Sequence, residues 1–133
     1  MKGIKVNKYI KKILSEDEEL TKIVSVKNIK AMVLQPTQYP FISFKRKSLE
    51  VEYTKDIPTE DKVMVEIICV SNDYTQTIDM AQRVRDILDF HVYTDSKEKV
   101  FISQIRMFDV EEDTVEDAFV QTLTFEFRIQ DLS

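Results

Sequence analysis

Near the C-terminus, apolar and polar side chains alternate over residues 118–129, and this run constrains the fold more than any other stretch. One side of the alternation carries Phe119, Gln121, Leu123, Phe125, Phe127 and Ile129, and the other carries Ala118, Val120, Thr122, Thr124, Glu126 and Arg128. A period of two is typical of a β-strand, and the run is longer than the usual strand of about 5–6 residues. Because the aromatic side must be covered, the sequence predicts a sheet with helices packed against it.

Helical spacing of apolar residues predicts three helices. Residues 4–14 place apolar side chains on one side and lysines on the other. Residues 15–18 match a capping box with Ser15 as the cap, which predicts a short second helix. A third helix begins after Asp73 and runs to about Phe90, and its buried stripe is expected to contain Ile78, Ala81, Val84 and Leu88.

Strand character also occurs elsewhere in the chain, at residues 29–34, 41–44, 62–70 and 100–108. The segment at 62–70 is apolar on both faces apart from Glu66, which predicts a central strand. Residues 48–61 are expected to form a protruding hairpin arm or a loop, with a turn at 56–59. Residues 92–99 are predicted to be a polar connection, and residues 109–117 a charged loop between two antiparallel strands.

Together these elements predict a single α+β domain over residues 1–133. Its sheet is expected to be mainly antiparallel or mixed, with four to five strands and helices packed on one face. With 133 residues, 43% of them hydrophobic and 32% charged, the chain can bury a core without disulfides or metal and has the composition of a soluble protein. No apolar run approaches the roughly 18–20 residues that span a bilayer, so no membrane partner is expected.

Charge and rare residues narrow the function classes. The net charge of −5 argues against a general nucleic-acid binder, which needs an excess of lysine and arginine on one face. The single cysteine, Cys69, lies in the apolar central strand and is expected to be a buried hydrophobe, and its isolation suits a reducing cytoplasm. The single glycine, Gly3, excludes glycine-rich phosphate loops and dinucleotide fingerprints.

No arrangement of residues suggests catalysis. The chain has no serine elbow, no His–Cys pair and no HExxH motif. His91 follows the third helix alone and is expected to be a helix-end residue. The acidic segment at 109–117 lacks the glycine that a calcium loop needs at its sharp turn. We therefore expect no enzyme activity, no catalytic residue, no metal site and no cofactor.

Several segments, taken in chain order, carry a family pattern: residues 10–24, the proline-led strand at 39–44, the strand-to-helix core at 63–67, 74–75 and 81–88, and the closing strand at 119–129. In this order they resemble the tail-terminator, or tail-completion, proteins of long-tailed bacteriophages and prophages. The resemblance covers nearly the whole chain.

The resemblance implies a structural role in virion assembly. Members of this family form a ring, typically a hexamer, on the end of the growing tail tube. The ring stops tube polymerisation and provides the surface that joins the head. The implied partners are further copies of the chain, the tail-tube protein and the head–tail connector protein, without sequence-specific nucleic acid. The implied location is the virion tail, with assembly in the cytoplasm of the bacterial host.

Opposite charges in two segments suggest where neighbouring subunits would touch, because a ring joins one patch to a different patch on the next copy. The candidates are the basic Lys45, Arg46 and Lys47, the acidic Glu111, Glu112 and Asp113, and Thr124 on the polar side of the last strand. Reversing the three acids to lysine is expected to weaken ring formation. Alternatively, the acids line the lumen of the ring, where like charge repels passing DNA.

A second function class remains open on the sequence. A small adaptor or regulatory module without catalytic activity would hold a peptide or a protein on an open face of its sheet. Oligomeric state separates the two hypotheses, because a terminator forms rings or caps tubes.

Overall fold

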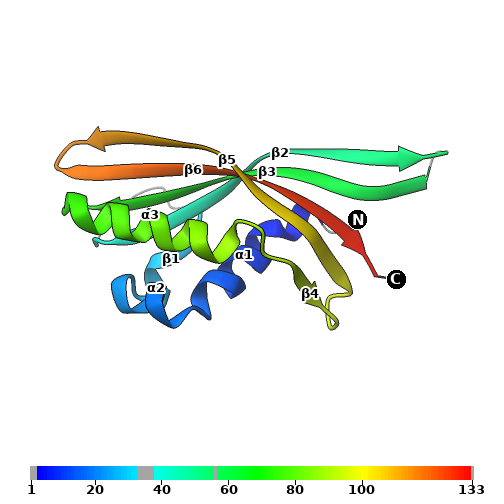
Figure 1. Cartoon of the computed structure of the whole chain (residues 1–133), viewed down its shortest axis with the longest axis horizontal. Coiled ribbons are helices and arrows are strands. Elements are labelled where there is room, and N and C mark those ends of the chain that lie inside the picture. The colour runs from blue at the N-terminus through cyan, green and yellow to red at the C-terminus, as the bar shows by residue number, and fades with distance from the viewer. Residues whose placement is uncertain (1–2, 33–37, 56, 133) are drawn as a thin grey trace.

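A computed structural model describes residues 3–32, 38–55 and 57–132. In this part of the chain, α1 (Val6–Ser15), α2 (Glu18–Ile23) and α3 (Tyr74–Leu88) lie on one side of a twisted six-stranded sheet (Figure 1). The strands are β1 (Ile29–Ala31), β2 (Phe41–Thr54), β3 (Ile57–Ser71), β4 (Tyr93–Asp95), β5 (Val100–Val115) and β6 (Ala118–Asp131). The α+β class and the helices on one face are confirmed.

The strands lie in the order β1-β2-β3-β6-β5-β4. Only β1 and β2 are parallel among the described neighbours, and all other pairs are antiparallel, so the sheet is mixed. The prediction of four to five strands is wrong. The sheet gains β4 because Tyr93–Asp95, within the expected polar connection, pairs with the first residues of β5.

The last strand has the predicted orientation. Leu123, Phe125, Phe127 and Ile129 of β6 are buried in the main core under the helices. The neighbouring β3 is central, as expected, and lies between β2 and β6. Its Cys69 is fully buried, and burial raises the pKa of the thiol to about 12, which makes it a core residue rather than a nucleophile.

Two details of the helices differ from expectation. Asp17, not Ser15, caps α2, because its carboxylate accepts the Leu20 N–H at 2.9 Å while Ser15 is the last residue of α1. The cap of α3 is Asp73, as predicted. Ile78, however, is 42% exposed, because the helix turns a different stripe toward the sheet; the buried residues are Thr77, Met80, Ala81, Val84 and Leu88.

The acidic segment is not a loop. β5 continues to Val115, and the chain reverses in a turn at Glu116 and Asp117 before β6 begins. Residues 109–115 are strand because each is in register with a residue of β6, as Val110 is with Leu123. Residues 48–61 form the protruding hairpin that was one of the two expectations, because β2 and β3 run through them as the end of one long hairpin (Figure 1). The expected turn at 56–59 differs, since the segment from Ile57 belongs to β3. The expected strand at 29–34 lies only partly within the described residues, where β1 ends at Ala31.

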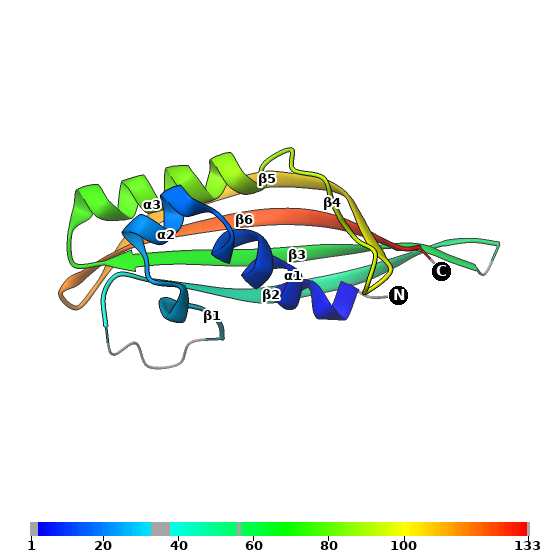
Figure 2. The ribbon, with the colours of Figure 1, turned by 90° about the horizontal axis from the view of Figure 1, so that it is seen from below.

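The two long hairpins point in opposite directions. The turn between β2 and β3 lies at one end of the molecule and the turn between β5 and β6 at the other (Figure 1, Figure 2). Between them, β3 and β6 pair over the shared middle of the sheet. Of the two ends, the one with the β5–β6 turn has α3 beside it.

Candidate subunit interface

Two strands of the sheet have outer edges without a strand partner in the described part of the chain. β1 pairs with residues 42–44 of β2, which leaves residues 45–54 as the β2 open edge. β4 pairs with residues 100–102 of β5, and the segment after α3 reaches Ile105, where Phe90 N–H donates to the carbonyl at 2.9 Å. Residues 106–115 then form the β5 open edge. Each edge is about ten residues long, and every second residue turns its N–H and C=O groups outward, where they can pair with another strand. On β5, the Met107 N–H already donates to Asp89 at 3.0 Å and the Thr114 N–H to Asp113 at 2.7 Å.

The two open edges lie diagonally across the sheet. They are on opposite sides of the strand order, and each is the part of its strand nearer to a different hairpin turn. β2 and β5 run antiparallel to each other, because three antiparallel pairings separate them. Two copies in the same orientation, placed side by side and shifted along the strand direction, would therefore present these edges to each other as an antiparallel pair of matching length.

Acidic side chains mark the β5 open edge. Register with Thr124, Thr122 and Val120 places Asp109, Glu111 and Asp113 on the face of the sheet that carries no helix, called the open face. Glu112 turns the other way: its Oε2 accepts hydrogen bonds from the Gln121 amide at 2.8 Å and the Tyr74 hydroxyl at 2.7 Å. These two bonds lower the pKa of Glu112, so this carboxylate has a role within the subunit.

Basic side chains mark the start of the β2 open edge, but the triplet is divided between the faces. Lys45 and Lys47 both approach Glu66 on the open face, at 3.7 and 3.8 Å. Arg46 instead donates to the Ile4 carbonyl at 3.2 Å. Because Lys45 and Lys47 are about half exposed, their pairs with Glu66 are weak and leave both charges available to a partner.

Within one subunit, the structure does not bring the predicted basic and acidic residues together. They lie on opposite edges, which is the arrangement that a contact between copies requires. Thr124 lies on the open face of β6, in register with Glu66 of β3 and Asp109 of β5. Thr124 is therefore one strand in from the β5 open edge and is not itself an edge residue.

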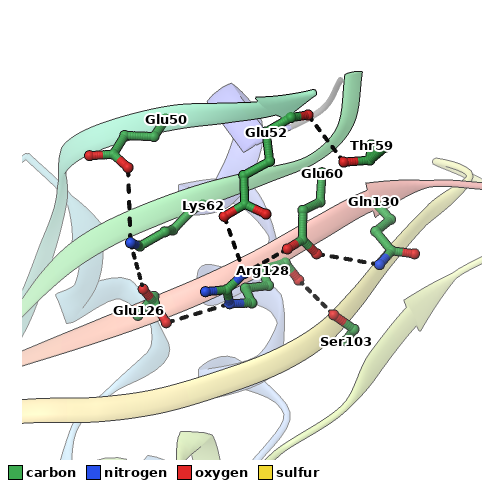
Figure 3. Close-up of polar contacts among 9 residues, drawn as sticks. All are labelled: Glu50, Glu52, Thr59, Glu60, Lys62, Ser103, Glu126, Arg128 and Gln130. Carbon is green, nitrogen blue, oxygen red and sulfur yellow. Dashed lines mark hydrogen bonds and ion pairs between the residues drawn. The ribbon is translucent and has the colours of Figure 1, made fainter. Parts of the chain in front are cut away.

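Arg128 is the centre of a charged cluster that sequence reasoning missed (Figure 3). Its Nη1 lies 2.7 Å from Glu60 of β3 and 3.4 Å from Glu52 of β2, and its Nε lies 3.6 Å from Glu126. Burial raises the pKa of Glu60, but hydrogen bonds from Arg128 and Gln130 outweigh it and hold the pKa below its usual range. Arg128 therefore ties both strands of the β2–β3 hairpin to β6.

A second cation completes the cluster. Lys62 lies 3.5 Å from Glu126 and 3.9 Å from Glu50, so it links β3 to the strands on both sides (Figure 3). Glu126 is only 7% exposed, and a buried carboxylate needs such partners. The alternation of residues 118–129 predicted an outward Glu126 and Arg128, but pairing across three strands gave no signal in the sequence.

An apolar groove of about 140 Å³ lies between α3 and the β5 open edge, on the helix side of the sheet. Ile78 and Arg85 of α3 line one wall, and Met107 and Val110 of β5 line the other. Ile78 is 42% exposed and Val110 is 47% exposed, so the groove opens to the surface with apolar side chains at its rim.

A larger hollow of about 300 Å³ lies where α1 and α3 end, beside His91 and Tyr93. Within it, Arg83 donates to both carboxylate oxygens of Asp17, at 2.7 and 2.9 Å. These bonds hold the pKa of Asp17 below its usual range. Across residues 3–32, 38–55 and 57–132, no three His, Cys, Asp or Glu side chains gather as metal ligands, and none of the helices is long and apolar enough to cross a membrane.

Comparison with known proteins supports the fold. No protein-family model matches the chain, and no curated protein matches it in sequence. Among solved structures, it is similar to a chain in the virion of a native gene transfer agent particle, with a TM-score of 0.72 and 16% sequence identity. The alignment covers 91% of this chain and 91% of that chain, so the two share the whole fold.

Proposed function

We propose that this protein is a structural component of a phage-type particle and acts as its tail terminator. Copies of the chain close into a ring on the end of the tail tube, stop its polymerisation and provide the head-joining surface. Six is the expected number of subunits, as is typical of the family that the sequence resembles. The fold shared with a chain of a gene transfer agent virion supports a role of this kind.

The observation that carries the proposal is the pair of open edges. Long unpaired strand edges are a liability in a monomer, because they attract the edges of other chains. Like charges disfavour pairing of two β5 open edges, whereas opposite charges favour the β5 acids against Lys45 and Lys47 of a β2 open edge. Such unlike pairing joins subunits head to tail, and the diagonal offset of the edges tilts the strands in the way that closes a sheet into a ring.

In this account, the partners are the tail-tube protein on one rim of the ring and the head–tail connector protein on the other. Assembly takes place in the bacterial cytoplasm, and the product belongs to the virion tail. We propose a role without catalysis.

Electron microscopy and native mass spectrometry test the proposal. The protein alone at high concentration, or mixed with tail-tube subunits, should form closed rings or capped tubes. The doubly reversed variant Glu111→Lys with Asp113→Lys should lose most of this assembly. Glu112 is left unchanged because its bonds to Tyr74 and Gln121 belong to the fold.

The matched control is Glu16→Lys with Glu19→Lys, which makes the same change in net charge on the helix layer. This control should assemble like the unaltered chain. If the unaltered chain stays monomeric at all concentrations and leaves tube ends uncapped, the terminator role is wrong.

The adaptor function remains the second candidate, because one observation favours it. An open strand edge beside an apolar groove also suits a peptide that adds a strand to β5. A stable monomer that ignores tail-tube subunits and binds an extended peptide at β5 would support this function instead.

A further inference from the structure

We propose that the groove between α3 and the β5 open edge receives the β2–β3 hairpin end of the neighbouring copy, with Val51 and Tyr53 as the anchoring side chains. This inference rests on the proposed ring, and it identifies the contact that buries apolar surface between neighbouring copies. The hairpin end, called the arm, comprises residues 50–54 of β2 and 57–60 of β3.

Two exposed apolar side chains of the arm face the helix side of the sheet. Val51 is in register with Asp61, whose carboxylate accepts the Gly3 N–H at 2.9 Å on that side. Residues in register across two strands share a face, and Tyr53 follows Val51 by one period of two. Val51 is 37% exposed and Tyr53 is 63% exposed, so the arm presents apolar area with little cover of its own.

The helix layer explains why these side chains lack cover. Among the described residues, the helices end short of the arm, while α3 lies beside β5 and β6 at the other end of the sheet (Figure 1, Figure 2). Each subunit therefore has an end with apolar strand residues and no helix, and an end with a helix and an open groove. A neighbouring copy placed head to tail would supply α3 to the arm.

The lengths of the open edges predict the position of the arm in the groove. Each open edge contains one extra residue, between Arg46 and Ser48 on β2 and between Met107 and Asp109 on β5. When the ends of residues 45–54 are matched antiparallel with the ends of residues 106–115 and these extra residues are allowed for, residues 51–53 lie opposite residues 107–110. This brings Val51 and Tyr53 to Met107 and Val110, which line the groove on its β5 side. The same alignment sets Lys47 near Asp113, while Glu50 and Glu52, which pair with Lys62 and Arg128 of their own subunit, lie opposite Glu111 and Asp109.

The charged cluster around Arg128 orders the arm before it binds. Arg128 holds Glu52 and Glu60, one from each strand of the arm, and thereby fixes the direction in which the arm leaves the sheet. A segment that is already ordered loses less conformational entropy on binding. Glu50 and Glu52 alternate with Val51 and Tyr53 along β2. The contacts of the two glutamates are therefore on the open face, and the two apolar side chains remain exposed on the helix side, where a neighbouring copy can bind them.

Cysteine crosslinking tests the inference in the full chain. Cys69 is fully buried, so new surface thiols can be read without interference from it. Tyr53→Cys with Val110→Cys, treated with a short bis-maleimide crosslinker, should give a ladder of covalent oligomers that ends at the closed ring. The matched control is Tyr53→Cys with Val26→Cys, because Val26 is exposed before β1 and outside the groove; it should give no ladder.

A second variant measures the contribution of the anchor. Tyr53→Ala should raise the concentration needed for half-maximal ring formation by about tenfold or more, as expected for a buried aromatic anchor, and Tyr53→Phe should restore assembly. If rings form but the 53/110 pair links no better than the control pair, the docking position is wrong while the terminator role stands. If no rings or capped tubes form under any condition, both proposals are wrong.

Discussion

The two hairpin ends of the sheet are built from the same kind of structure but differ in charge and in cover. The β5–β6 end carries Asp109, Glu111 and Asp113 on its open face and has α3 beside it. The β2–β3 end carries Lys45 and Lys47 near its base, has no helix beneath it among the described residues, and is held by Arg128. In the proposed ring, the β5–β6 end receives a strand and the β2–β3 end supplies it.

Because its two open edges differ and lie at opposite ends of the sheet, one subunit cannot pair them with each other. A dimer with twofold symmetry through the β5 open edges would set acid against acid, whereas a head-to-tail arrangement gives every open edge a strand partner. The asymmetry between the ends therefore favours a ring.

The largest expected effect comes from the strand that both ends share. Phe125→Ala removes a fully buried ring from β6 and should lower the free energy of unfolding by about 3–5 kcal/mol. Urea denaturation monitored by circular dichroism measures this loss. Thr124→Lys, one residue away on the open face, should stay folded; equal midpoints for the unaltered chain and Phe125→Ala would show that the inside and outside of β6 are reversed.

Removing the Arg128 charge should destabilise the β2–β3 end and leave the β5–β6 end unchanged. Arg128→Gln leaves Glu126, Glu60 and Glu52 with fewer partners and should cost about 1–3 kcal/mol. Hydrogen exchange should accelerate in residues 50–54 and 57–60 while residues 109–115 keep their protection.

Arg106→Gln is the control for this variant, since Arg106 stacks on Phe90 away from the arm. Uniform acceleration at both ends would contradict the local role of Arg128.

A smaller effect is expected at the opposite end. Asp17→Asn keeps an N-cap for α2 but loses the charge of the pair with Arg83 on α3, and should cost about 1 kcal/mol at pH 7. Because the pair holds the folded-state pKa of Asp17 below its unfolded value, its stabilisation is present above about pH 4 and is lost as the pH falls through that lower pKa.

The unfolding free energies of the two chains, measured from pH 7 to pH 2, should therefore converge in acid. A difference that stays constant over this range would show that the ion pair does not contribute.

Strong periodicity explains which elements the sequence predicted well. The alternation in β6, the two apolar faces of β3 and the Asp73 cap of α3 are local patterns, and each corresponds to an observed element. Each pattern is set by residues close together in the chain, so composition and spacing are enough to predict the strand, its buried face or the helix cap.

The acidic end of β5 shows why other elements were missed. Asp and Glu disfavour strands, and among residues 109–113 only Val110 is apolar, so local propensity predicts a loop. The strand forms because β6 offers a continuous ladder opposite it. Likewise, the exposure of Ile78 and the clamp at Arg128 depend on tertiary packing, so the groove and the arm contacts could not be predicted from spacing.

The central claim is that the acids of the β5 open edge meet Lys45 and Lys47 of the next copy, and a mixing experiment tests it most directly. One variant carries Glu111→Lys and Asp113→Lys. The other carries Lys45→Glu and Lys47→Glu, with Glu66→Lys to preserve the pairs within the subunit. Native mass spectrometry should find neither variant in rings alone, and rings with equal numbers of both when they are mixed. Rings formed by either variant alone as readily as by the unaltered chain, or a mixture that stays monomeric while the unaltered chain assembles, would contradict the claim.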